Sequence, residues 1–240
     1  MNRVSVALKP STRPGVPMRT LLALAALALL PDLAAAQATT YDLSADSGRL
    51  YVVVRAKRGG LLSGLGHDHV VVASRFRGEM TWDPSDPSAC DVQLSFPASA
   101  LVVDPGSARS WAELDGETSD GDKAKIRDNL LGRRQLEADR FSTVSYQSTG
   151  CELQGDLVAV QGGLTLHGVT HTVTVPMRIR PGEDSITASG QFDATHADFG
   201  MEPFSAMMGA LRNDEGLSFF VDVRGTARPS PADVADAGAQ

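Results

Sequence analysis

The stretch VVVASRFRGEMTW, residues 70–82, alternates between apolar and polar side chains with a period of two. One set of alternate positions is apolar and contains Val70, Val72, Phe76, Met80 and Trp82. The other set is mainly polar and contains Ala73, Arg75, Arg77, Glu79 and Thr81. Successive side chains of a β-strand point to opposite faces, so this stretch predicts a strand with one buried face.

The same alternation recurs along the chain, near residues 50, 92, 144, 173 and 217, and Gly, Asp and Pro separate the runs. This pattern predicts eight or nine antiparallel strands. Only 122–131, DKAKIRDNLL, is typical of a helix, and the polar stretch 104–122 before it is expected to be a mobile loop. Because closure removes exposed sheet edges, we expect an all-β, eight-stranded antiparallel barrel with one short helix in a crossover loop.

The N-terminus predicts export. From Met18, an alternative start, one arginine precedes an apolar run from Leu21 to Leu30 and an A-x-A site that ends at Ala36. We therefore interpret 1–36 as a signal peptide cleaved before Gln37, 37–227 as the barrel domain and 228–240 as a disordered tail. The apolar run is about half of the roughly 20 residues that a spanning helix requires, so no stable membrane anchor is expected.

Charge argues against nucleic acid as a partner. Removal of 1–36 takes away four of the 22 basic residues and one of the 29 acidic residues, which leaves a net charge of about −10. Such a field repels phosphate backbones and anionic head groups. The sequence leaves open whether the chain forms a homodimer.

Four stretches of the chain resemble the YceI-like family, and the similarity extends over 41–227. They are FRGEMTWDPSDPSACDVQLSFPASAL (76–101), IRDNLLGRRQLEADRFSTVSYQST (126–149), GGLTLHGVTHTVTVPMRI (162–179) and DFGMEPFSAMMGAL (198–211). The resemblance implies a lipocalin-like barrel, exported to the bacterial periplasm, whose long apolar tunnel holds a polyisoprenoid or isoprenoid-quinone-like chain. The chain departs from the family at Arg140-Phe141-Ser142, at His171 and at the trio 67–69.

The inward-facing positions supply candidates for the wall of such a tunnel. They are Leu50, Val52, Val54, Val72, Phe76, Met80, Leu94, Phe96, Tyr146, Val175, Met177, Phe192, Phe219 and Val221. A dry inner face binds an apolar lipid without a charged recognition residue or an obligatory cofactor. The alternative is that these side chains meet and fill a solid core.

The stretch GLGHDHVVV, 64–72, supports two alternative functions. His67 and His69 share one strand face and could chelate a divalent metal ion, with His171, His167, His196 or Asp198 as a third ligand. A histidine beside Asp68 could also serve as the general base of a hydrolase. However, G-x-S-x-G and H-E-x-x-H are absent, and neighbours on a strand point to opposite faces. Alternation places both histidines outside and Asp68 inside.

The two cysteines, Cys90 and Cys151, lie at the start of one predicted strand and at the end of another. If these strands are antiparallel neighbours, the cysteines can form a disulfide at the rim of the barrel. Two free buried thiols are the alternative.

Overall fold

The computed structural model describes residues 38–57 and 66–229. The predicted signal peptide and nearly all of the predicted C-terminal tail lie outside these residues. Within the described ranges, no helix is both long enough and apolar enough to cross a membrane.

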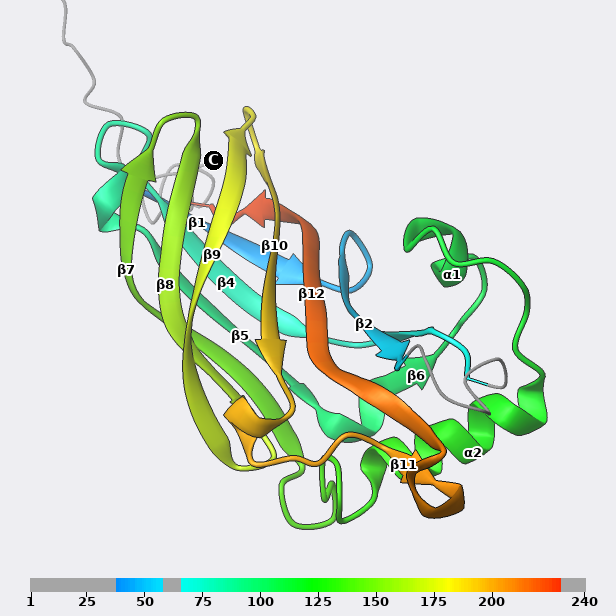
Figure 1. The fold of residues 1–240 in the computed structure, drawn as a ribbon. Helices are drawn as coiled ribbons and strands as arrows, with labels where there is room; N and C mark the ends of the chain where they lie inside the picture. Colours follow the sequence, from blue (N-terminus) through cyan, green and yellow to red (C-terminus); the bar gives the residue numbers. More distant parts are fainter. Residues whose placement is uncertain (1–37, 58–65, 230–240) are drawn as a thin grey trace, which may run out of the picture. The chain divides into compact units, whose positions relative to one another are not determined.

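The described chain is mainly β-structure (Figure 1). Its strands are β1 (Thr39–Ser44), β2 (Arg49–Ala56), β3 (His69–Ala73), β4 (Arg77–Trp82), β5 (Asp91–Pro97), β6 (Leu101–Val103), β7 (Thr143–Gln154), β8 (Leu157–Leu166), β9 (Val169–Pro181), β10 (Ser185–Thr195), β11 (Ser205–Ala206) and β12 (Leu211–Ala227). The helices are α1 (Ala108–Trp111) and α2 (Asp120–Leu131), with the 3₁₀ turns η2 (Pro87–Ala89), η3 (Ala98–Ala100), η4 (Ala197–Phe199) and η5 (Met207–Gly209).

The sheet closes into a barrel because β12 pairs along both of its edges. β10 lies on one edge, while β1 and β2 lie end to end on the other, with Tyr41 opposite Ala227 and Leu50 opposite Val221. Next along the same sheet, β4 pairs with β1, and β3 pairs with β2. Beyond these, β5 pairs with β4, and β6 pairs with β3. The strand segments therefore form eight antiparallel barrel strands in sequence order, as predicted. Both helices lie in the connection from β6 to β7.

A bend between β3 and β4 reverses the alternation predicted for 70–82. The Ser74 amide and hydroxyl both donate to Ala100 O, at 3.0 and 2.7 Å, where the ladder is interrupted. After the bend, Met80 faces the interior as predicted, but before it Val71 lines the interior and Val72 packs on the outside. The prediction that Val72 faces inward is therefore wrong, because 74–76 are not part of a continuous strand.

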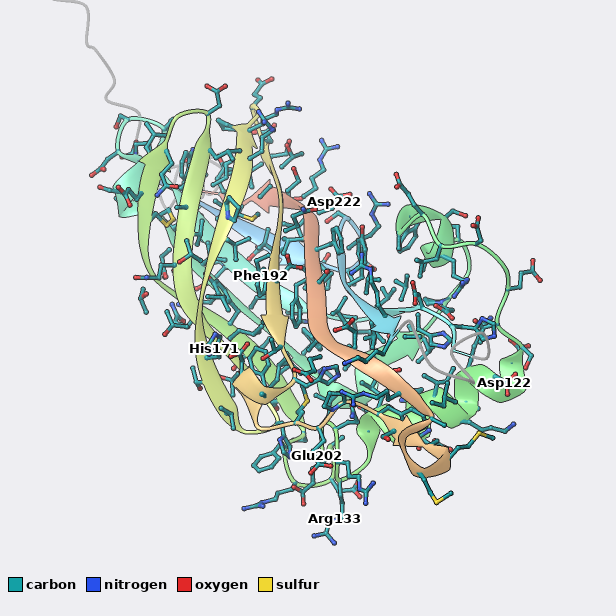
Figure 2. The ribbon with its side chains drawn as sticks, viewed as in Figure 1. Asp122, Arg133, His171, Phe192, Glu202 and Asp222 are labelled. Atoms are coloured by element: carbon teal, nitrogen blue, oxygen red, sulfur yellow. A yellow bond between two sulfur atoms is a disulfide. The ribbon has the colours of Figure 1, made fainter. Side chains whose placement is uncertain are left out.

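The stretch 104–122 forms an outer layer, which corrects the prediction of a mobile loop without a core. Ala108 of α1 is buried against Val53, Val70 and Val72 on the outer face of β2 and β3. Trp111 packs in the same outer cluster and carries the Arg49 guanidinium 4.9 Å above its ring. These strands are consequently buried on both faces, whereas charged side chains project outward over the rest of the barrel (Figure 2).

Asp104 anchors this outer layer. Its side chain is fully buried and accepts hydrogen bonds from the Val70 amide (2.8 Å), His69 Nδ1 (2.8 Å), Thr118 Oγ1 (2.6 Å) and Arg109 Nη1 (3.1 Å). Burial alone would raise the carboxyl pKa, but the hydrogen bonds from His69, Thr118 and Val70 and the charge of His69 lower the pKa to about 2.

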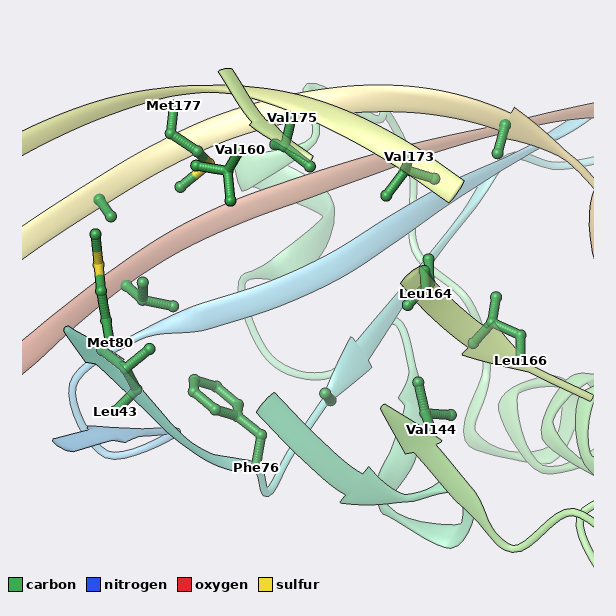
Figure 3. Packing of buried hydrophobic residues seen from close by; sticks show 14 of the residues in the cluster. Leu43, Phe76, Met80, Val144, Val160, Leu164, Leu166, Val173, Val175 and Met177 are labelled. Carbon is green, nitrogen blue, oxygen red and sulfur yellow. The ribbon is translucent and has the colours of Figure 1, made fainter. Parts of the chain in front are cut away.

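The interior of the barrel is a single large apolar cluster (Figure 3). Met80 reaches inward from β4, and Val160, Val175 and Met177 reach inward from β8 and β9. Burial of this surface supplies the main driving force for folding, at about 25 cal/mol per Å².

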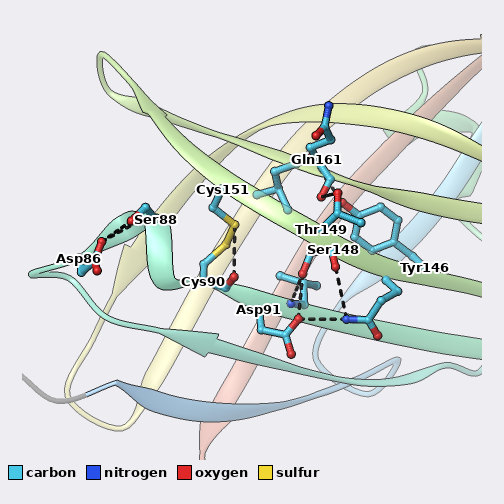
Figure 4. The surroundings of a disulfide bond; sticks show 12 residues. Asp86, Ser88, Cys90, Asp91, Tyr146, Ser148, Thr149, Cys151 and Gln161 are labelled. Carbon is cyan, nitrogen blue, oxygen red and sulfur yellow. Dashed lines mark hydrogen bonds between the residues drawn. A yellow bond between two sulfur atoms is a disulfide. The ribbon is translucent and has the colours of Figure 1, made fainter.

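Cys90 and Cys151 are joined in a disulfide, with their Cα atoms 5.9 Å apart (Figure 4). The bond connects the residue before β5 to β7, and these two strands are antiparallel neighbours. Next to it, Ser148 Oγ accepts from the Val92 amide at 2.8 Å and donates to Asp91 Oδ1 at 2.9 Å. The disulfide thus fixes one end of an already hydrogen-bonded strand pair.

Replacement of both cysteines by alanine is expected to lower the free energy of unfolding. The bond closes a loop with a sequence separation of 61 residues, for which chain entropy gives about 4 kcal/mol. Urea unfolding of the oxidised protein and of the double variant measures the difference. Recovery of two alkylatable thiols from the unreduced protein would refute the disulfide itself.

The Asp104 carboxylate should make stability depend on acid pH. Because its pKa is lower in the folded chain than the ordinary value of 3.8, it stabilises the fold above about pH 4, and this contribution disappears as the pH falls towards 2. The contribution is on the order of 2 kcal/mol. Unfolding free energies of the unmutated protein and of Asp104→Asn should therefore converge between pH 5 and 2. A difference that is constant over this range would contradict the assignment.

Candidate functional site

The interior side chains do not fill the barrel. They enclose a cavity of about 200 Å³ in which the centre of a water-sized molecule can move. Each of the eight barrel strands contributes to the wall; one residue from each segment is Leu43, Leu50, Val71, Met80, Val92, Leu101, Val144, Val160, Val175, Ala188 and Leu217. The interior is therefore hollow, which argues against the alternative of a solid core.

Most of the predicted wall residues line this cavity. They are Leu50, Val52, Val54, Met80, Leu94, Phe96, Tyr146, Val175, Met177, Phe192, Phe219 and Val221. Val72 lies on the outer face for the reason given above. Phe76 lies in the bend after β3 and is buried in the core, 4 % exposed, without lining the cavity.

The cavity is elongated along the barrel strands. Leu217, Phe219, Val221 and Val223 all line it from alternate positions of β12. These six residue steps cover about 20 Å at the usual rise of a strand. The shape therefore suits an extended ligand better than a compact one.

The connecting segments close one end of the cavity with residues that the alternation could not identify. Leu130 belongs to α2, Gln135 and Leu136 follow it, and His196 and Met201 flank η4. None of them lies within a strand. A sequence signal exists only for Leu130, which is placed one helical turn after Ile126.

A second cavity, of about 450 Å³, adjoins the first and is more polar. The two share Val54, Val71, Leu130 and Gln135. The polar residues of the second cavity are His67, His69, Glu117, Thr118, Ser119, Asp122, Lys125, Asn129, Gln135 and Asn213. At the α2 end, the apolar cavity thus continues into a space whose wall carries both acidic and basic side chains.

The structure does not bring the three predicted metal ligands together. His67 and His69 line the second cavity, as does Asp122, whereas His171 lies on β9 across the barrel (Figure 2). His171 Nε2 is 4.0 Å from Asp198 Oδ1 instead. Among the described residues, no group of three His, Cys, Asp or Glu side chains is arranged to hold a metal ion.

The local geometry of the His-Asp-His trio also differs from the prediction. His69 shares the inward parity of Val71, so the prediction that it faces outward is wrong, again because of the bend after β3. Its Nδ1 is paired with Asp104, while Asp68 Oδ1 accepts the Ala56 amide at 2.9 Å. The carboxylate that orients His69 is therefore Asp104 rather than its neighbour in the sequence.

Comparison with known proteins identifies the family. A family model described as the YceI-like domain matches residues 62–222. A UPF0312 protein of Pseudomonas aeruginosa is 28% identical over 169 residues, which cover 69% of this chain and 75% of that protein. A UPF0312 protein of Yersinia pestis is 28% identical over 163 residues, covering 67% and 72% respectively.

A solved structure agrees with the architecture. The crystal structure of Burkholderia cenocepacia BcnA superposes with a TM-score of 0.53 at 14% sequence identity, over 74% of this chain and 96% of BcnA. At this identity the likeness concerns the fold alone. The family model covers well over half of the sequence, and the residues that it matches form most of the closed antiparallel barrel. The chain therefore belongs to the YceI-like family.

Proposed function

We propose that this protein binds a polyisoprenoid, an isoprenoid quinone or a similar long apolar lipid inside the barrel. After export it carries or sequesters that lipid in the periplasm. The observation that carries the proposal is the elongated cavity, whose wall is built almost entirely from aliphatic and aromatic side chains.

The physical chemistry of the wall favours a hydrocarbon chain. Each CH₂ group that leaves water for such a cavity gains about 0.8 kcal/mol, so a chain with many carbons binds without any charged contact. Aliphatic residues such as Val160, Val175 and Val221 offer rounded, non-directional surfaces that suit a branched, flexible ligand. Hydrogen bonds are then needed only where the lipid has a polar end.

Export is part of the proposal. It is supported by the signal-like sequence of 18–36 and by the disulfide, a bond that persists in oxidising compartments.

Protein purified from cells that express the full chain should carry a bound lipid. Native mass spectrometry is expected to reveal an isoprenoid adduct, and delipidated protein should regain one equivalent on addition of an isoprenoid alcohol or quinone. The physical reason is the unfilled apolar cavity. Protein that carries no lipid and gives no mass shift with any added isoprenoid would contradict the proposal.

A bulky residue in the wall should displace the ligand without breaking the fold. Val175 is buried and lines the cavity, so Val175→Trp places an indole where the chain would lie. Loss of room for two or more CH₂ groups predicts at least a tenfold weaker affinity. Titration of delipidated protein with geranylgeraniol measures the effect.

The matched control is Thr174→Trp, which places the same residue on the exposed face of the same strand. It should bind like the unmutated protein, and thermal melting should show both variants to be folded. Equal affinities for the two variants would place the ligand outside the barrel.

A further inference from the structure

Tyr51 is among the residues around the cavity, but its ring packs in the outer cluster and stacks on Phe220. Three other polar side chains interrupt the apolar wall of the cavity, namely Gln135, Tyr146 and His196. All three are fully or largely buried. Ser145 also borders the cavity, but alternation along β7 turns its side chain away, because Val144 and Tyr146 point inward. The hydrogen bonds of these three groups determine which polar end of a ligand they can accept.

His196 presents an acceptor. The residue is only 2% exposed, and its backbone amide and its Nδ1 both lie 3.0 Å from Glu215 O. A carbonyl oxygen can only accept, so Nδ1 must carry the hydrogen and Nε2 keeps its lone pair. Burial lowers the imidazole pKa, against the hydrogen bond to Glu215 and the charges of Asp214 and Glu215, which favours the neutral ring. Within the part of the chain that the structure describes, Nε2 has no hydrogen-bond partner.

Gln135 presents a second acceptor at the same end of the cavity. Its Nε2 donates to Glu202 O, and this carbonyl fixes the orientation of the amide, since the amide oxygen could not make that contact. Met201 N also donates to the backbone oxygen of His196 at 3.0 Å, so residues 201 and 202 contact the backbone of His196 and the side chain of Gln135. The second N–H of the amide and its Oε1 are left next to the cavity, so Gln135 can both donate to a ligand hydroxyl and accept from it.

Tyr146 follows the same rule further along the wall. Its hydroxyl donates to Val160 O at 3.3 Å, and burial raises the pKa of the phenol to about 12, so that the group stays neutral. With its hydrogen committed to a backbone carbonyl, the phenol oxygen offers only lone pairs to a ligand.

From these contacts we infer that the barrel selects lipids whose polar end is a hydroxyl, such as a prenyl alcohol or a hydroquinone, over the corresponding carbonyl compounds. His196 Nε2 receives the hydroxyl hydrogen at the α2 end of the cavity, and the hydroxyl oxygen can accept the second N–H of Gln135. The inference rests on the proposed function and narrows the chemical class of its ligand.

A lipid that ends in a carbonyl group has no hydrogen to donate to this site. Its oxygen can only accept, so it makes no hydrogen bond to His196 Nε2, whose ring donates from Nδ1 to Glu215 O instead, and it leaves that lone pair unpaired. A buried polar group without a partner loses its hydration and regains nothing. Sites built to bond a hydroxyl therefore reject analogues that lack it.

The test compares two ligands with the same carbon chain, geranylgeraniol and geranylgeranial, which differ only in the hydroxyl and aldehyde ends. Delipidated protein should bind the alcohol about tenfold more tightly, which corresponds to about 1.4 kcal/mol. In His196→Phe this ratio should fall at least threefold. In His171→Phe, which alters a half-exposed histidine on β9, the ratio should stay unchanged.

Nitrogen NMR of the unmutated protein tests the same contact without a variant. The unprotonated Nε2 of His196 should shift when the alcohol binds and should not respond in this way to the aldehyde. Equal affinities for the two ligands, or an Nε2 resonance that ignores the alcohol, would overturn the inference and leave the proposed function intact. Failure of both ligands to bind would overturn both.

Discussion

The double pairing of β12 is the constraint on which the barrel depends. This 17-residue strand joins β10 along one edge and β1 and β2 along the other, so the sheet closes on itself. Among the described strands, the short β6 pairs only with β3, and Arg127 of α2 donates to Leu101 O of β6. Closure satisfies the backbone groups within the sheet, and the interior can therefore be apolar without being solid. A ligand cavity of this kind cannot form in an open sheet, because its core has to be filled from the second layer.

The cavity remains hollow because of the sizes of the residues in its wall. Valine and alanine at positions such as Val160, Val175 and Ala188 do not reach across the barrel. Glycine gives the larger side chains room beside the wall. A Cβ atom at Gly162 would lie 2.5 Å from Tyr146 Oη, and one at Gly190 would lie 2.6 Å from Met177 Sδ. The long side chains consequently lie along the sheet rather than across the cavity.

The fold and most of the cavity wall could be predicted from period-two alternation, because a strand converts sequence parity directly into inside and outside. The prediction failed for Val72 because residues 74–76 interrupt that parity. The continuous runs YVVV (51–54) and VVVA (70–73) carry a signal for burial on both faces, which α1 provides. Gln135 and His196 could not be predicted, since they belong to connections whose position depends on the closed barrel.

The polar character of the cavity follows from the same geometry. The register of β12 against β2 shifts between Asn213 and Leu217, and within that irregular segment Glu215 O is taken up by the amide and the ring of His196. Buried carbonyl groups need donors, and at Glu215 O a side chain of the wall supplies one in addition to a backbone amide. His196 and Tyr146 therefore donate their hydrogens to backbone carbonyls of the barrel and present lone pairs to the ligand. Selection of a hydroxyl-bearing lipid is, in this sense, a consequence of how the barrel satisfies its own carbonyl groups.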